Sequence, residues 1–233
     1  MRLDKSIASQ GEYSRREVKE LLKKGRIAVN GVTVKDPGLQ VNPETDQIVV
    51  DGVSLNYKEH VYLMLNKPKG YISATEDRSQ KTVLDLVPEE LFRSGLFPAG
   101  RLDGDTTGFI LLTDDGAFAH KILSPKNHIQ KTYVALLEHP VSEEDIAAFE
   151  QGIILGDGTD CLPAEVEVLE ENVVQIKICE GKYHQIKRMF AARDNRVQEL
   201  MRTHMGLLEL DPELEEGECR EITPEELELV QSR

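Results

Sequence analysis

Apolar residues at the start of the chain recur with helical spacing. They are Leu3, Ile7 and Ala8 in a first segment and Val18, Leu21 and Leu22 in a second. Residues three and four apart lie on one face of a helix, so each set forms an apolar stripe. Ser14 and Glu17 make a capping-box pattern ahead of the second stripe, and Gly25 follows it as a helix stop. The pattern predicts two amphipathic helices near the N-terminus.

β-branched residues follow the second predicted helix. Residues 27–34 place Asn30 and Gly31 between two such runs, which is the strongest short signal for a β-hairpin. A third strand is predicted over residues 47–50. Residues 51–59 are rich in turn-forming residues and are typical of a linker. We therefore predict a small domain at residues 1–59 and a larger domain at residues 60–233.

Strands in the larger domain are predicted over residues 62–65, 109–112, 132–137, 164–169 and 173–179. The apolar run 109–112 is continuous, as expected of a strand that is covered on both faces. Ala164, Val166 and Val168 alternate with glutamates, which predicts one packed face and one wet face.

A helix over residues 142–152 is predicted by its end signals. Ser142 and Asp145 suit its N-terminus, and Gly152 suits its end. The order of strands and helices lacks the regular alternation of a parallel βαβ sheet. The predicted fold class is α+β: a small domain of helices and a hairpin, followed by a larger domain with a mixed, mainly antiparallel sheet flanked by helices.

Asp103 stands just before the buried run 109–112, in a loop that contains Gly100, Gly104 and Gly108. Glycines allow another backbone to approach closely, which a site for a bulky substrate requires. Arg101 adds a cation to the same loop. An ordinary turn with a capping aspartate explains these residues equally well, so residue chemistry alone leaves both interpretations open.

The charges are segregated along the chain. The 42 Asp and Glu outnumber the 28 Lys and Arg, giving a formal net charge of −14. Residues 1–35 nevertheless hold nine basic against four acidic side chains, a net +5, whereas residues 203–233 hold two against ten, a net −8. Arg15, Arg16, Lys19 and Lys23 lie opposite the apolar stripe of the second predicted helix. They form either a phosphate-binding face or a merely solvated one.

Composition narrows the class of protein. With 233 residues, of which 39% are hydrophobic, the chain can bury a substantial core. No apolar run approaches the roughly 20 residues of a membrane span, and the first residues lack a signal-peptide core, so we expect a soluble, cytoplasmic protein. Cys161, Cys179 and Cys219 are far apart, and the six histidines show no ligand spacing. Neither a disulfide framework nor a metal site is predicted.

Three stretches resemble the motifs of the RsuA-type pseudouridine synthases. They are Gly-Arg-Leu-Asp at residues 100–103, Lys-Thr-Tyr at 131–133 and Glu-Gly-Lys-Tyr-His-Gln-Ile-Lys-Arg-Met-Phe at 180–190. The N-terminal segment resembles the S4 RNA-binding domain, so the similarity covers essentially the whole chain. It implies a pseudouridine synthase fold and the isomerisation of one uridine in ribosomal RNA. In detail the resemblance is to the small-subunit enzymes, which modify 16S RNA at the position-516 type of site.

The resemblance also assigns roles to residues. Asp103 corresponds to the catalytic carboxylate, Tyr133 to the aromatic ring beneath a flipped-out base, and Lys187 to the cation beside the carboxylate. Arg101 and Arg188 correspond to RNA contacts. The reaction breaks the N1–C1′ bond, turns the base and joins C5 to C1′, so no cofactor or metal is expected. We expect a monomer whose partner is 16S ribosomal RNA or the assembling small subunit, with no membrane partner.

Spacing adds two expectations about these motifs. Lys131 and Tyr133 are two apart in a predicted strand, which predicts that ammonium and ring flank one pocket. Ile186, Met189 and Phe190 have helical spacing and should anchor a helix, which leaves Lys187 on another face.

Three alternatives compete with this interpretation. One is a large-subunit (23S) enzyme of the same family, and another is a catalytically inert RNA-binding factor for ribosome assembly. The third is a glycoside hydrolase that uses Asp103 with Asp105 or Asp114 with Asp115 as its carboxylate pair. Sugar sites usually have aromatic platforms, but the chain has no Trp and only 5% aromatic residues, which disfavours the hydrolase.

Overall fold

The computed structural model describes residues 1–232, which form two compact units. The first unit comprises Met1–Val61 together with Pro88–Leu96, and the second comprises Tyr62–Val87 and the chain from Phe97 onward. Arg93 attaches the separate segment to the first unit: its Nε donates to the Ser9 carbonyl at 2.5 Å. No sequence pattern assigned residues 88–96 to the N-terminal part.

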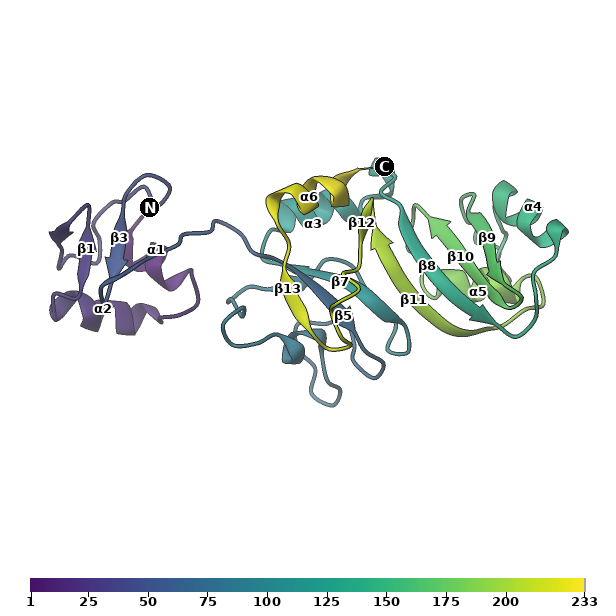
Figure 1. Ribbon diagram of the computed structural model, residues 1–233, viewed down its shortest axis with the longest axis horizontal. Coiled ribbons are helices and arrows are strands. Elements are labelled where there is room, and N and C mark those ends of the chain that lie inside the picture. The colour runs from purple at the N-terminus through teal and green to yellow at the C-terminus, as the bar shows by residue number, and fades with distance from the viewer. Residues whose placement is uncertain (233) are drawn as a thin grey trace. The chain divides into compact units, whose positions relative to one another are not determined.

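Two helices and a small sheet make up the first unit (Figure 1). Its elements are α1 (Leu3–Ala8), α2 (Arg15–Lys23), β1 (Ile27–Val29), β2 (Val32–Thr33), β3 (Ile48–Val50) and β4 (Val53–Ser54), with strand order β2-β1-β3-β4. The capping box of Ser14 and Glu17 is present at the start of α2. Asn30 and Gly31 both have positive φ, as a two-residue hairpin turn between β1 and β2 requires. Both expected helices and the hairpin are confirmed, whereas β4 lies inside the predicted linker.

The core of the first unit is built from the residues that the apolar pattern predicted. Leu3 and Ile7 of α1, Val18 and Leu22 of α2, and Ile27 of β1 are fully or almost fully buried together. The short helices are thus stabilised by packing of their apolar faces rather than by their length.

The second unit is organised around a nine-stranded sheet. Its strands are β5 (Tyr62–Lys67), β6 (Phe97–Pro98), β7 (Thr107–Thr113), β8 (Lys131–Leu137), β9 (Glu165–Glu170), β10 (Val173–Ile178), β11 (Val197–Met205), β12 (Leu208–Glu209) and β13 (Cys219–Glu221). The main order is β13-β5-β7-β11-β8-β10-β9. Neighbours run antiparallel except β7 and β11, which are parallel. The predicted mixed, mainly antiparallel sheet is confirmed.

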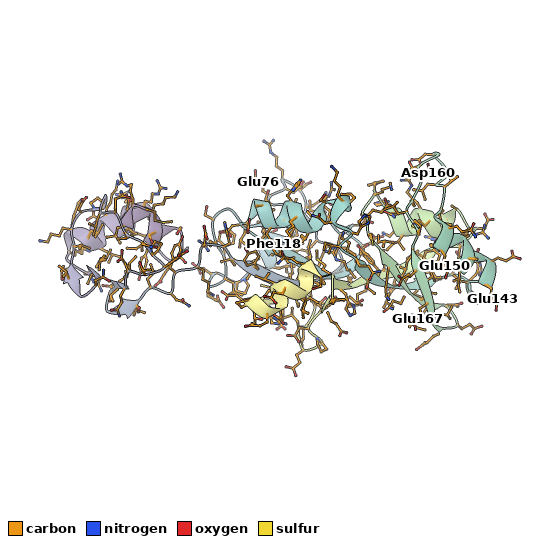
Figure 2. All side chains as sticks on the ribbon, turned by 90° about the horizontal axis from the view of Figure 1, so that it is seen from above. Glu76, Phe118, Glu143, Glu150, Asp160 and Glu167 are labelled. Carbon is orange, nitrogen blue, oxygen red and sulfur yellow. The ribbon has the colours of Figure 1, made fainter. Side chains whose placement is uncertain are left out.

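Helices flank this sheet in Figure 1. They are α3 (Gly116–Leu123), α4 (Glu143–Gln151), α5 (Gln185–Ala191) and α6 (Pro224–Gln231), with 3-10 turns at Val83–Leu86 and Pro125–Asn127. Ala119 and Ile122 of α3 and Val230 of α6 pack with Phe109 and Leu111 of β7 in one buried cluster. Phe118, labelled in Figure 2, lies on α3. Its ring meets the Tyr62 ring edge-on, with centroids 4.9 Å apart.

The strands β7 and β9 differ in how well their burial follows the predicted pattern. Every residue of β7 is buried, as the continuous apolar run predicted. The alternation in β9 was misleading: Val168 was expected on a packed face, but it is 47% exposed. Because β9 is the last strand of the sheet, part of its apolar side is left uncovered.

Candidate active site

Asp103 lies in the loop before β7, and a buried lysine ties this loop down. Lys67, at the end of β5, has no exposed surface. Its Nζ donates to the carbonyls of Thr106 at 2.8 Å and Pro68 at 3.1 Å, and lies 3.4 Å from that of Gly104. Burial lowers the pKa of Lys67 to about 8, although the nearby carboxylates of Asp105 and Asp103 act in the opposite direction. No sequence pattern singled out this residue.

Further hydrogen bonds hold the same loop from its other side. The Ser73 hydroxyl donates to the Leu102 carbonyl and accepts from the Leu102 amide, both at 2.9 Å. The Gly70 amide donates to the Gly104 carbonyl at 2.7 Å. Asp103 is therefore carried by a loop whose backbone is fixed at several points, as a preorganised site requires.

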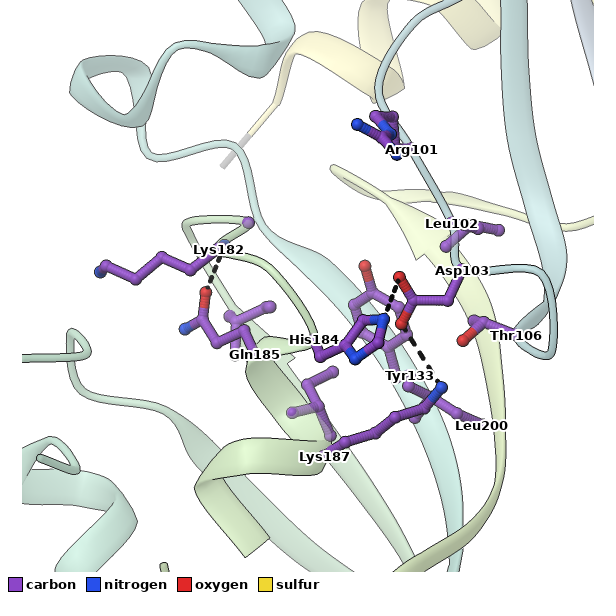
Figure 3. Close-up of a pocket in the computed structure, with 13 residues that line it drawn as sticks. Arg101, Leu102, Asp103, Thr106, Tyr133, Lys182, His184, Gln185, Lys187 and Leu200 are labelled. Carbon is purple, nitrogen blue, oxygen red and sulfur yellow. Dashed lines mark hydrogen bonds and ion pairs between the residues drawn. The ribbon is translucent and has the colours of Figure 1, made fainter. Parts of the chain in front are cut away.

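Two basic side chains from the α5 region approach Asp103 (Figure 3). Lys187 Nζ lies 3.4 Å from one carboxylate oxygen, and His184 Nε2 lies 3.4 Å from the other. Lys187 Nζ is closer to Asp105, at 2.6 Å, and this hydrogen bond lowers the pKa of Asp105. The Asp105 side chain is 71% exposed and that of Lys187 only 23%. The ammonium is thus shared between two carboxylates, a partnership that the sequence predicted for Asp103 alone.

Tyr133, on β8, forms part of the same pocket as Asp103. The ring is 8% exposed, and the guanidinium carbon of the buried Arg202 lies 6.0 Å from its centroid. Arg202 is held in turn by a 2.6 Å hydrogen bond from its Nε to the Phe109 carbonyl. The Arg202 cation therefore lies within the range of a cation–π contact with the Tyr133 ring.

Lys131 does not share this pocket with Tyr133, contrary to the expectation from strand alternation. Its ammonium turns back to the Ile129 carbonyl at 2.8 Å, and Lys131 is absent from the described lining of the pocket. Burial lowers the pKa of Lys131 to about 8, and the charge of Arg202 contributes. The Lys131 ammonium thus ends in the interior instead of at the pocket.

The pocket encloses about 430 Å³, including the part that opens to solvent. Its lining mixes charged, polar and apolar side chains: Arg101, Leu102, Asp103, Thr106, Tyr133, Ile178, Gly181, Lys182, His184, Gln185, Ile186, Lys187 and Leu200. The Thr106 hydroxyl is buried and has no hydrogen-bond partner among residues 1–232. It is available to a ligand, because buried polar groups are otherwise almost always paired.

Hydrogen bonds of Glu180 and Gln185 hold the segment before α5 that lines the pocket. The side-chain NH₂ of Gln185 donates to the buried Glu180 carboxylate at 2.7 Å. The side-chain oxygen of Gln185 accepts from the Lys182 backbone amide at 2.9 Å. Glu180 also forms an ion pair with Lys182 and accepts from the Leu162 amide at 2.9 Å. These bonds fix the turn into α5, where His184 adopts a left-handed conformation with φ 47°.

The other predicted RNA contacts lie in varied surroundings. Arg101 is exposed and lines the pocket. Arg188 forms a 2.5 Å ion pair with Asp157. The four basic residues predicted on α2, Arg15, Arg16, Lys19 and Lys23, are all exposed, and Lys23 pairs with Glu20 at 2.8 Å. The pocket thus brings together Asp103, Tyr133, Lys187 and Arg101, while Arg188 is engaged by a carboxylate beside it.

Two features are absent from the described part of the chain. Within residues 1–232, no group of three or more His, Cys, Asp or Glu side chains is arranged to hold a metal ion. No helix in that range has both the length and the apolar character needed to cross a membrane.

Comparison with known proteins supplies an independent measure of similarity. A family model described as RNA pseudouridylate synthase matches residues 61–192, and an S4 domain model matches residues 1–48. A Bacillus subtilis protein named uncharacterized RNA pseudouridine synthase YtzG is 47% identical, with 99% of this chain and 98% of that protein covered.

Two further similarities extend over the full chain. An Escherichia coli K12 protein named ribosomal small subunit pseudouridine synthase A is 42% identical, with 99% of this chain and 100% of that protein covered. A crystal structure of a pseudouridylate synthase is 41% identical and superposes with a TM-score of 0.70, with 99% of each chain covered.

Proposed function

The chain belongs to the RsuA-type RNA pseudouridine synthases, and we propose that it converts one uridine of 16S ribosomal RNA to pseudouridine, at the position-516 type of site. The observation that carries the proposal is the fixed loop that presents Asp103 to a pocket shared with Tyr133 and Lys187. The choice of the small-subunit RNA is supported by the names of relatives about 42–43% identical over their full length.

Asp103 is the proposed catalytic carboxylate. The reaction breaks the N1–C1′ bond of the uridine, rotates the freed uracil and forms a C5–C1′ bond, with the C5 proton ending on solvent and N1 taking up a proton. Atoms and electrons balance without an oxidant, so one carboxylate suffices to attack or to stabilise the sugar as the base departs. The same overall balance holds for attack at C1′, attack at C6 or a glycal intermediate.

Tyr133 and Lys187 complete the proposed machinery. A uridine must leave its stack to reach Asp103, and the flat ring of Tyr133 offers a surface for the exposed base. We propose that the same phenol assists removal of the C5 proton. Lys187 supplies positive charge beside Asp103, and the apolar side chains Leu102, Ile186 and Leu200 keep water from capturing the sugar while the base is detached.

Two of the alternatives differ from the proposal in substrate or in activity. A large-subunit enzyme would act on 23S RNA with the same machinery, and an inert assembly factor would bind RNA without changing it. The hydrolase interpretation is wrong, because the family consists of isomerases. The second carboxylate pair considered for a hydrolase was Asp114 with Asp115. Asp115 instead caps α3, because it accepts hydrogen bonds from the Ala117 and Phe118 amides.

Tritium release tests the enzymatic proposal. Wild-type protein should release tritium from 16S RNA labelled at C5 of uridine, whereas Asp103→Asn should bind the same RNA and release none. Asp160→Asn removes an exposed carboxylate outside the pocket and should behave like wild type. Equal release by the wild type and Asp103→Asn would refute the role of Asp103, and no release by either would favour the inert factor.

The substrate is tested separately. Pseudouridine mapping in 16S and 23S RNA from a strain lacking the gene should show the loss of a single 16S site, restored by the wild-type gene but not by Asp103→Asn. Loss of a 23S site instead would support the large-subunit alternative. We further propose that the protein acts in the cytoplasm as a monomer on ribosomal RNA or on the assembling small subunit.

A further inference from the structure

An exposed pair of stacked rings lies beside the catalytic pocket. Tyr183 and His184 are stacked with ring centroids 3.8 Å apart and an interplanar angle of 17°. The His184 ring lines the pocket, with its Nε2 3.4 Å from Asp103. Tyr183 does not line the pocket and is 73% exposed, an unusual exposure for a large ring. Because the imidazole covers one face of the phenol ring, the exposed area lies on its other face and its edges.

The backbone around this pair is held in place. The backbone amide of Gln185 donates to the Lys182 carbonyl at 3.2 Å, and the backbone amide of Arg188 donates to the His184 carbonyl at 3.0 Å. The Arg188 side chain also donates to the Tyr183 carbonyl at 3.3 Å, while its own position is fixed by Asp157. A rigid aromatic ring loses little conformational freedom when it binds a ligand, so this arrangement suits recognition.

We propose that the outer face of Tyr183 stacks against the nucleobase that neighbours the target uridine in the RNA. This inference rests on the proposed function, because it takes the substrate to be an RNA strand with a flipped-out uridine at Asp103. His184 links the two residues, because its Nε2 lies 3.4 Å from Asp103 and its ring centroid lies 3.8 Å from that of Tyr183. A base next to the flipped uridine is therefore within reach of the phenol ring. An unpaired base beside the flipped nucleotide is without one of its stacking partners and gains a new one in the phenol ring.

Removal of the ring should weaken RNA binding. Base–aromatic stacking corresponds to an affinity change of about 5- to 150-fold for substitution by alanine. Tyr183→Ala should therefore raise the Kd for a 16S RNA fragment by that factor, whereas Tyr183→Phe should stay within about 2-fold, since it keeps the ring. Ile154→Ala is the matched control: Ile154 is 68% exposed in the same unit and does not line the pocket. It should bind RNA like wild type.

Changes in the RNA identify what the ring contacts. Abasic residues are placed in turn on the 5′ and the 3′ side of the target uridine. At one of the two positions, the abasic residue should raise the Kd of the wild type by a factor similar to that of Tyr183→Ala. The same abasic RNA should bind Tyr183→Ala no more weakly than the intact RNA does, because the stack is already absent. Abasic residues farther along the strand should weaken RNA binding by wild type and by Tyr183→Ala equally. This result would exclude a general effect on RNA structure.

The outcomes separate this inference from the proposed function. Tritium release by the wild type is measured on the same RNA. If the wild type releases tritium but Tyr183→Ala binds normally, or if the protein and RNA changes are additive, the stacking inference is overturned and the activity stands. If the wild type releases none, the proposed function fails and the inference fails with it.

Discussion

At the residue scale, one ammonium serves two carboxylates. Lys187 is 2.6 Å from Asp105 and 3.4 Å from Asp103, so its shorter contact is with the carboxylate that is more exposed to water. We infer that Asp105 positions the ammonium and that Asp103 keeps lone pairs free for the sugar. In the proposed reaction, one positive charge thus stabilises the site without fully occupying the oxygen atoms of Asp103.

Replacing Lys187 tests the need for this charge. Lys187→Met leaves Asp103 and Asp105 without their shared cation, and we expect the rate at saturating RNA to fall about 10²- to 10³-fold, as when one preorganised electrostatic partner is removed. Lys187→Arg keeps the charge and should cost less than about 10-fold. Single-turnover tritium release measures both rates. Wild-type kinetics for Lys187→Met would show that the ion pair is only structural.

The sequence predicted the acidic, aromatic and cationic members of this pocket, but not all of their partners. Asp103, Tyr133 and Lys187 stand in motifs that are recognisable along the chain, and the structure brings them to one cavity. The burial of Lys67 was not predicted, because a lysine is rarely buried completely. Its burial depends on three carbonyl groups that surround its ammonium in the folded chain. The contact of His184 with Asp103 depends on a left-handed backbone conformation that no local pattern signals.

At the scale of elements, end signals located the helix α4, whereas the apolar pattern missed the central strand β11. The cap of Ser142 and Asp145 and the stop at Gly152 predicted α4 almost to the residue. β11 was not predicted, because Glu199, Arg202 and other polar residues interrupt its apolar positions. It is nevertheless the strand that joins β7 to β8, and its polar side chains are explained by contacts across the sheet rather than along the chain.

The parallel pairing of β7 and β11 depends on Gly108. This residue has φ +92°, and a Cβ atom there would lie only 2.2 Å from the Arg202 carbonyl oxygen. Gly108→Ala should therefore lower the free energy of unfolding by about 3 kcal/mol or more, since both backbone strain and a steric clash oppose the methyl group. Urea denaturation, followed by circular dichroism, measures the effect.

Gly104→Ala is the matched control for this change. A Cβ atom at Gly104 would meet nothing within 4 Å, so its unfolding midpoint should stay close to that of wild type. If both alanine variants unfold at the same urea concentration as wild type, close approach of the strands at Gly108 does not limit stability.

At the scale of the whole molecule, an acidic protein has to bind a polyanion. In the second unit, Glu143 and Glu150 on α4 and Glu167 on β9 extend around the α4 end of the sheet, as Figure 2 shows. The N-terminal 35 residues instead carry a net positive charge, and all four basic residues predicted on α2 are exposed. This distribution favours RNA contact through selected faces and repels it from others, which restricts the orientations in which RNA can bind.

Charge reversal on α2 tests whether its basic face binds phosphates. The triple variant Arg15→Glu, Arg16→Glu and Lys19→Glu should bind 16S RNA more weakly, and the slope of log Kd against log salt should fall by about one unit for each phosphate group that the variant no longer binds. The control reverses Lys5, Lys35 and Lys126, which are exposed and lie outside α2, so it changes the net charge equally. Its slope should remain close to that of wild type. If both triple variants shift the slope by the same amount, the effect is one of net charge and α2 is only a solvated helix.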